Sequence, residues 1–467
     1  MVGPGVFAMR IHHAFLLILS LALTLQAQVQ LQPRAGKPVL GLTASQLARF
    51  DAGRVVFNTQ ILPGEGLGPC FNQQSCGGCH GIPDAGGAGT IEVTRFGIAA
   101  TGGMPFNPLG ALGGSLLQSQ AINPACLEVV PAAANVVINR ITPPAFGMGL
   151  VQAIPDAAII ANAINPPAGV SGIVHMVGAF EDPAGAPLHA GRFGWKAQVA
   201  TALTFSADAA LMEMGLTNRF VTTEQAPNGN AVLLAQWDLV ADPEDGPDAQ
   251  GFHKIDRMAD FQRFLAAPPQ TPRNGMGGEA IFMSIGCGSC HTPSFTSGTV
   301  AEAALSNKTF RPYGDFLLHD MGSLGDGIVQ GAGTENEMRT APLWGVRARP
   351  ALLHDGRATG QDFAGNIDLS VQDHFGEASA SRLAWNALSF AQQALVVNFL
   401  DSLGRAEFDH DGDNDVDMVD WFYMRIGFTG PVPTYMPDDA NSRHDVDQDG
   451  DLDVVDFVHM QRAFSGQ

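Results

Sequence analysis

Basic residues are scarce in this sequence. It holds 25 Lys and Arg against 46 Asp and Glu, which gives a formal net charge of −21 at pH 7. Binding to nucleic acid needs clustered basic side chains, so this balance argues against a nucleic-acid partner. The imbalance is uneven, because residues 401–467 carry a net charge of −12 and residues 1–400 only −9. We therefore expect a separate acidic module at the C-terminal end.

Long apolar runs are also lacking. After residue 25, the sequence has no stretch of the roughly 18 consecutive apolar residues that a membrane-spanning helix needs. A shorter run, residues 14–25, follows Arg10, His12 and His13, which is the order of a secretory signal. We expect residues 1–27 to be a signal peptide, with an uncleaved anchor as the alternative. The mature protein is then expected to be periplasmic or extracellular, the cell surface included, without a membrane span.

Cysteine is rare, and most of it falls in one repeated motif. Two thiols at C-x-x-C spacing can add across the vinyl groups of one haem, and an adjoining histidine then supplies a nitrogen to the iron. A zinc knuckle or a redox dithiol is the alternative for a single C-x-x-C, but no second pair lies near either copy to complete a four-ligand site. The pattern predicts two covalent c-type haems. The motif residues are Cys76, Cys79 and His80, and Cys287, Cys290 and His291.

Two cysteines, Cys70 and Cys126, remain outside the motifs. In an oxidising compartment a disulfide is the default for such a pair, and two buried thiols are the alternative. Their spacing in the sequence does not decide, because pairing depends on the Cα distance in the fold.

The acidic end contains two loops with the ligand spacing of calcium sites, 36 residues apart. Carboxylates recur at positions 1, 3, 5, 7, 9 and 12, and a short helix is expected after each loop. Asn414 takes the turn position usually given to glycine, which Asn tolerates. A solvated acidic tail is the alternative, but random acids would not keep this register twice. The predicted ligands are Asp409, Asp411, Asp413, Asp415, Asp417 and Asp420, and Asp445, Asp447, Asp449, Asp451, Asp453 and Asp456.

The remaining composition suits a globular chain with long loops. At 467 residues the chain is long enough for about three domains, and 45% hydrophobic residues are ample for packed cores. With 55 Gly and 30 Pro, we expect long ordered loops that could wrap a cofactor. Apolar spacing and capping residues predict helices that start at Thr43 and that span residues 260–267, 279–284 and 391–403.

Several segments together resemble the bacterial di-haem oxidoreductase family, whose members are named di-haem peroxidases and, in older usage, thiol oxidoreductases. The resemblance covers roughly residues 43–404 and rests on the order and number of the segments. These segments are Gly68-Pro69-Cys70-Phe71-Asn72, residues 191–198, His319-Asp320-Met321-Gly322, residues 339–345, His354-Asp355-Gly356-Arg357 and His374-Phe375-Gly376-Glu377.

The resemblance implies a mainly α fold with two cytochrome-c-like haem domains. We expect a first haem domain at 43–265, a second at 266–404 and the calcium module at 405–467. By the same likeness, the haem on His80 meets hydrogen peroxide and the haem on His291 receives electrons from a donor protein. A non-catalytic electron-transfer protein is the alternative. Thiol oxidation rests only on the older name, since haem occupies each C-x-x-C.

Several distal residues follow from the resemblance. Gln152 stands where the family often has a glutamate, and an amide can bond peroxide but cannot accept its proton. We predict Gln152 and Arg192 as catalytic residues and Trp195 as a residue that packs between cofactors. A packed aromatic turn is the alternative for residues 191–198, in which Lys196 is also expected at a haem edge.

Candidate axial ligands and propionate contacts are also implied. For the second haem we expect His374 as the sixth ligand, with Met321 as the rival, and Met ligation would raise the potential. We predict that His354 and Arg357 contact the propionates. For the first haem, Met148, His175 and an open sixth position stay open.

The acidic tail resembles a pair of dockerin type I repeats. Dockerins bind cohesins, so the resemblance implies a cohesin-like or cell-surface partner. Calcium is expected to fold this module, because its clustered carboxylates repel one another without a cation.

Overall fold

The computed structural model describes residues 30–464. The predicted signal peptide, residues 1–27, lies outside the described residues. Within them, the helices are all too short or too polar to cross a lipid bilayer.

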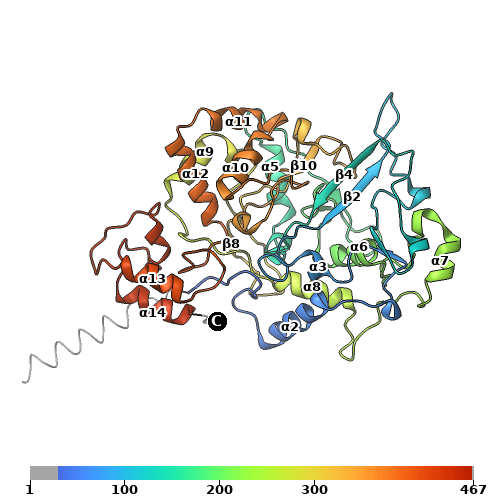
Figure 1. The fold of residues 1–467 in the computed structure, drawn as a ribbon, viewed down its shortest axis with the longest axis horizontal. Coiled ribbons are helices and arrows are strands. Elements are labelled where there is room, and N and C mark those ends of the chain that lie inside the picture. The colour runs from blue at the N-terminus through green and yellow to red at the C-terminus, as the bar shows by residue number, and fades with distance from the viewer. Residues whose placement is uncertain (1–29, 465–467) are drawn as a thin grey trace, which may run out of the picture.

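Helices dominate the regular structure, as predicted, and the strands form short antiparallel pairs joined by long loops (Figure 1). The α-helices are α2 (Ala44–Asn58), α3 (Cys76–Cys79), α4 (Met148–Gln152), α5 (Asp156–Ile164), α6 (Ala202–Met214), α7 (Ala231–Trp237), α8 (Lys254–Phe264), α9 (Gly277–Ser284), α10 (Phe363–Gln372), α11 (Ser379–Asn386), α12 (Phe390–Ser402), α13 (Met418–Ile426) and α14 (Val454–Ala463). The strand pairs are β1 (Cys70–Phe71) with β3 (Gln120–Ala121), β2 (Glu92–Gly97) with β4 (Val136–Ile141), β5 (Met176–Val177) with β6 (His189–Ala190), β7 (Phe295–Thr296) with β8 (Thr309–Phe310), and β9 (Leu318–Asp320) with β10 (Glu337–Arg339).

Local capping explains where the helices begin. The predicted start at Thr43 is confirmed, since its hydroxyl accepts from Gln46 N and the Gln46 side chain accepts from Thr43 N. The helix predicted at 260–267 instead runs over Lys254–Phe264. It begins earlier because the Asp256 carboxylate accepts from His253 N, a capping bond that the apolar spacing did not reveal.

Helices α2 and α8 pack tightly beside the first C-x-x-C-H. Gly53 permits the close approach, because a Cβ at this position would lie 2.3 Å from the Arg257 carbonyl oxygen. One turn further along, the Phe57 and Phe261 rings pack with centroids 4.8 Å apart. The Phe57 ring in turn lies 6.0 Å from the His80 ring.

Helices α9 and α12 repeat this arrangement beside the second motif. A Cβ on Gly278 would lie 2.0 Å from the Leu395 carbonyl oxygen. The Phe282 and Phe399 centroids are 5.5 Å apart, and the Phe282 ring lies 6.0 Å from the His291 ring. Each histidine is therefore supported by the same glycine, phenylalanine and partner-helix geometry, with the phenylalanine four positions after the glycine.

The hydrophobic core around α2 and α8 extends past the predicted boundary at residue 265. It also contains Phe295, Phe310, Phe316 and Trp344. A second core lies between α9 and α12, and a small separate one holds α13 and α14 together. Figure 1 shows α13 and α14 at one end of the molecule. The division into haem domains stays a prediction.

Candidate functional site

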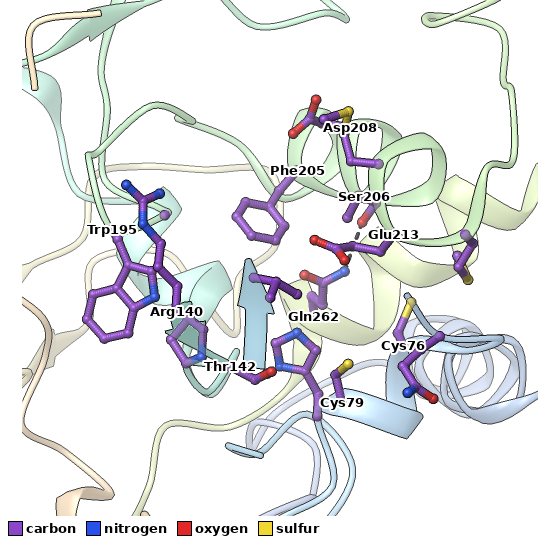
Figure 2. Close-up of a pocket in the computed structure, with 18 of the residues that line it drawn as sticks. Cys76, Cys79, Arg140, Thr142, Trp195, Phe205, Ser206, Asp208, Glu213 and Gln262 are labelled. Atoms are coloured by element: carbon purple, nitrogen blue, oxygen red, sulfur yellow. Dashed lines mark hydrogen bonds between the residues drawn. The ribbon is translucent and has the colours of Figure 1, made fainter. Parts of the chain in front are cut away.

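The first motif lies in a cavity of about 160 Å³. Helix α3 positions Cys76 and Cys79, and the Ser75 hydroxyl caps this single turn by accepting from Gly78 N. Figure 2 shows both thiols beside a space bordered by Phe205 and Glu213 of α6 and, on the other side, Trp195.

The second motif lies in a larger cavity of about 540 Å³. Cys287, Cys290 and His291 line it, and His374 and Met321 border the same space. The structure therefore brings both predicted sixth-ligand candidates to the second motif.

Three histidines at these cavities share one orientation. Each ring donates from Nδ1 to a backbone carbonyl: His80 to Gly87 at 3.2 Å, His291 to Tyr313 at 3.0 Å and His374 to Ser370 at 2.6 Å. Burial lowers the pKa of His80 and of His291 to about 4 and also lowers the pKa of His374. Each ring is thus neutral at pH 7 and keeps Nε2 as a lone-pair donor, the state that an iron ligand needs.

Two other buried histidines, His175 and His319, are engaged differently. His175 donates from Nδ1 to Lys196 O and accepts at Nε2 from Ala332 N, so its ring has no nitrogen left for iron. His319 bonds carboxylates at both nitrogens. His175 is therefore not available as the sixth ligand of the first haem. Met148 stays a candidate, because it borders a small third cavity that His80 also lines.

Buried polar atoms without hydrogen-bond partners test whether the cavities suit haem. Within the described residues, such atoms line the second cavity at Arg349 Nε, His354 Nε2 and Arg382 Nε, and the first cavity at Arg95 Nε. A buried polar nitrogen without a partner is costly, and a propionate carboxylate would satisfy the donors among these atoms. The donor sets therefore fit a haem in each cavity.

The two residues predicted to contact the propionates lie differently in the structure. His354 borders the second cavity, whereas Arg357 is exposed and its guanidinium bonds Asp355 instead. Sequence reasoning missed Arg95 and Arg349. Strand alternation offers a signal for Arg95, because β2 and β4 pair so that Arg95 and Arg140 share the face toward the first cavity.

Trp195 borders both cavities. Its indole Nε1 donates to Ile141 O at 3.2 Å, and its ring meets His354 edge-on at 6.2 Å. Arg339 holds the backbone of this residue by two hydrogen bonds. Its amide donates to Trp195 O, and its Nε donates to the preceding carbonyl, Gly194 O. The indole is held between the two motifs.

Lys196 points away from the cavities, contrary to the expectation of a haem edge. Its ammonium lies 3.0 Å from Asp326, whose second carboxylate oxygen accepts from Arg140. Burial would raise the pKa of Asp326, but Arg140 and Lys196 together lower it. This buried triad fastens β4 to the loop before β10.

The two predicted catalytic residues hydrogen-bond to helix ends, and their catalytic roles stay predictions. Gln152 lines neither of the two motif cavities nor the third one, and its side-chain oxygen accepts from Ala202 N at the start of α6 at 2.9 Å. Arg192 is buried beside the third cavity, where it donates to the backbone carbonyls of Val151, Gln152 and Ile154. Both bonds serve helix ends, which have unpaired backbone groups.

Cys70 and Cys126 are buried free thiols in this structure. The default expectation of a disulfide is therefore not met, and the alternative of two buried thiols describes the fold. Burial raises the pKa of Cys70 and of Cys126, which keeps both thiols protonated.

The two acidic loops have matching hydrogen bonds. In the first, Asp417 caps α13, and Asp420 accepts from Asp417 N and His410 N. In the second, Asp453 caps α14, and Asp456 accepts from Asp453 N and Val446 N. Asn414 has a φ of 76°, as its predicted turn position requires. Carboxylate oxygens converge within 4.8 Å in three of the acidic groups. These groups are Asp409, Asp411 and Asp420; Asp415, Asp417 and Asp420; and Asp445, Asp447 and Asp456.

Comparisons with known proteins point to one family. The model of the family described as "Di-haem oxidoreductase, putative peroxidase" matches residues 133–403, a span that includes the second C-x-x-C-H and begins after the first. Among solved structures, a MauG-like protein associated with microbial copper homeostasis is 13% identical, with 80% of this chain and 93% of that chain covered. The TM-score between the two structures is 0.35. No curated protein matches the chain.

Proposed function

We propose that this chain, which belongs to the di-haem oxidoreductase family, reduces hydrogen peroxide with electrons relayed from the second C-x-x-C-H centre to the first. Haem iron supplies the one-electron redox chemistry. The chain supplies two cavities, an attachment motif in each, and neutral histidines oriented by backbone carbonyls. An electron-donor protein delivers electrons at the second centre.

The position of Trp195 carries this proposal. One indole borders both cavities, with His354 of the second cavity against its edge. An aromatic side chain between two redox centres provides a π-system on the electron's route. The distance that the electron crosses through saturated groups is then shorter. The two hydrogen bonds from Arg339 to the Gly194 and Trp195 carbonyls hold the indole in this position. Trp195 is accordingly assigned as the bridge between cofactors.

Spectroscopy of the haem-loaded, calcium-loaded protein tests the proposal. EPR and visible spectra are recorded fully oxidised and half-reduced, before and after addition of hydrogen peroxide. We expect a high-spin haem that peroxide converts rapidly in the half-reduced protein. Two low-spin haems that stay inert to peroxide at half-reduction would contradict peroxide reduction.

An electron-transfer protein is the second candidate, and Met148 is the observation that favours it. Its side chain is buried beside a cavity that His80 also lines. A thioether ligand there would close the sixth position of the first iron and exclude peroxide. The same spectra separate the two functions, because a closed position gives a low-spin first haem.

For the acidic tail we propose two calcium ions and a dockerin-like role with a cohesin-like or cell-surface partner. The donor set supports calcium, since Asp409 is 1% exposed and its Oδ1 has no hydrogen-bond partner among the described residues. Calcium-dependent binding of a cohesin domain to the whole chain tests the partner.

We also propose export to the periplasm, the medium or the cell surface. The support is the apolar run at residues 14–25 and the use of C-x-x-C-H haem attachment. A mature N-terminus after residue 27, found by sequencing the isolated protein, would test this.

A further inference from the structure

The first cavity contains carboxylates that no part of the sequence comparison assigned. Asp208 and Glu213, both on α6, line it together with Cys76, Cys79 and His80. They are the acidic side chains among the described residues that line this cavity, whereas Gln152 is engaged with the α6 backbone elsewhere. A proton carrier for chemistry in this cavity is therefore to be sought on α6.

Glu213 is the more firmly positioned of the two. Its Oε2 accepts from Asn72 Nδ2 at 2.8 Å, and its backbone carbonyl accepts from the Asn72 and Gln73 amides. Asn72 is itself buried, and its side-chain oxygen accepts from Ser119 N at 2.9 Å and Ser119 Oγ at 3.1 Å. The amide orientation is thus fixed, and it leaves Oε1 of Glu213 as the oxygen free to face the cavity.

The surroundings of Glu213 suit a group that exchanges protons. Figure 2 shows its carboxylate directed into the space that the hydrogen-bonded pair of Ser206 and Gln262 also borders. Burial raises the pKa of Glu213, while Asn72 and Arg95 lower it and Asp208 raises it further. A raised carboxyl pKa brings the group closer to the operating pH, where acid–base catalysis is most effective. Asp208, by contrast, is exposed.

We propose that Glu213 is the catalytic acid–base of the first cavity, held in place by the positioning residue Asn72. This inference rests on the proposed peroxide reduction. The Glu213 carboxylate takes the proton from one peroxide oxygen and returns it to the other as the O–O bond breaks, so that one water leaves. The remaining oxygen takes up two electrons from the donor protein and two protons from solvent and forms the second water. The sum is H2O2 with two electrons and two protons giving two H2O, and Glu213 ends as it began.

The role also explains the Gly68–Asn72 segment, which the family resemblance singled out without a function. Strand β1 places Asn72 directly before the haem motif, and the same residue bonds the end of α6. One short segment therefore sets the distance between the thiols and Glu213.

The test compares Glu213→Gln with Asp208→Asn and Glu213→Asp in the full-length, haem-loaded protein. Glu213→Gln is expected to slow the reaction of the half-reduced protein with peroxide by about 10²–10⁴-fold. Asp208→Asn, a neutralised carboxylate in the same cavity, should stay within a few-fold of wild type, and Glu213→Asp should recover part of the loss. Equal losses in Glu213→Gln and Asp208→Asn, or none in Glu213→Gln, would overturn the assignment.

A binding measurement keeps the inference separate from the proposed function. Cyanide binds ferric haem as the anion, so hydrogen cyanide must give its proton to a base. We expect Glu213→Gln to slow cyanide binding to the oxidised first haem and to flatten its pH dependence, with an unchanged haem content. A wild type inert to peroxide would contradict peroxide reduction alone. Identical cyanide kinetics in wild type and Glu213→Gln, or no cyanide binding to the first haem of either, would overturn the role of Glu213.

Discussion

At the scale of single residues, one acidic cluster lies outside the cavities. Glu224, Asp238, Asp242 and Glu244 each bring a carboxylate oxygen within 4.8 Å of the others. Glu224 Oε2 is buried and has no hydrogen-bond partner among the described residues. Burial, followed by the charges of Glu244, Asp238 and Asp242, raises the pKa of Glu224 to about 9. The Glu224 carboxyl is therefore protonated at pH 7 in the folded chain.

This raised pKa predicts a pH-dependent stability with a definite sign. The unfolded glutamate titrates near pH 4.3, so folding takes up a proton between that pH and about 9, and stability falls as the pH rises through this window. Glu224→Gln removes the titration. It should raise the free energy of unfolding at pH 9 by roughly 1–3 kcal/mol and change it little at pH 5.

Thermal unfolding at both pH values, in EDTA, measures this effect. Glu92→Gln is the control, because Glu92 is an exposed glutamate on β2. A variant Glu224→Gln that is less stable than wild type at pH 9 would show that the ionised carboxylate contributes to the fold.

The two C-x-x-C-H motifs and the alternating Asp could be found from local spacing, and the family resemblance identified Trp195, His354 and His374, which line the cavities. C-x-x-C-H and alternating Asp have a fixed spacing, so the chain segment alone defines the group. Arg192 and Gln152 sit in segments that resemble a family, but their contacts depend on α4 and α6. Glu213 reaches the first cavity through helix packing, which local patterns do not encode, whereas strand alternation carries a signal for Arg95.

At the scale of elements, the two motifs share one helix-pair design. Gly53 with Phe57 in α2, and Gly278 with Phe282 in α9, place the phenylalanine one turn after the close contact. Sequence reasoning predicted most of these helices but missed the repeat, because the chain between Phe57 and Cys76 is much longer than that between Phe282 and Cys287. The G-x-x-x-F pattern is apparent only once the partner helices are known.

Each glycine of the repeat should resist substitution. In Gly53→Ala and Gly278→Ala, the new Cβ would lie 2.3 and 2.0 Å from a backbone oxygen, so the helices must separate. We expect each to cost about 1–3 kcal/mol in the free energy of unfolding, as overpacking does. Chemical denaturation measures the loss, with Gly64→Ala as the control, since a Cβ at Gly64 meets open space. An unchanged free energy of unfolding in both variants would show that the helix pairs adapt.

At the scale of the whole molecule, the acidic tail is fastened to the body that carries the second motif. Arg347 donates to Gly412 O in the first loop and bonds Asp401. Its neighbours Val346 and Arg349 line the second cavity. Asp438 accepts from Gly277 N at the start of α9, the helix that leads to Cys287. The proposed calcium module is therefore part of the support of the second cavity as well as a docking element.

The first calcium loop differs from the second in its contact with Arg405. Its guanidinium donates to Asp409 O and His410 O, both at 2.9 Å, and pairs with Asp401. In the second loop, Gly450 O accepts instead from the Thr434 and Tyr435 amides of the tail itself. Ordering of the first loop should thus be transmitted to Arg347 and the second cavity, while ordering of the second loop should stay within the tail.

Matched variants in the two loops separate these effects. Asp411→Ala and Asp447→Ala each remove one converging carboxylate, and each should abolish one of two calcium sites in a calorimetric titration. Because carboxylates that repel one another loosen a loop without its cation, Asp411→Ala should also speed hydrogen exchange at residues 346–349 and change the second-haem spectrum, as chelation does in wild type. Asp447→Ala should lose its calcium yet keep the wild-type exchange and spectrum. If residues 346–349 exchange hydrogen at the same rate in both variants, calcium in the first loop does not stabilise the second cavity. The arginine contacts are then an attachment that does not depend on calcium.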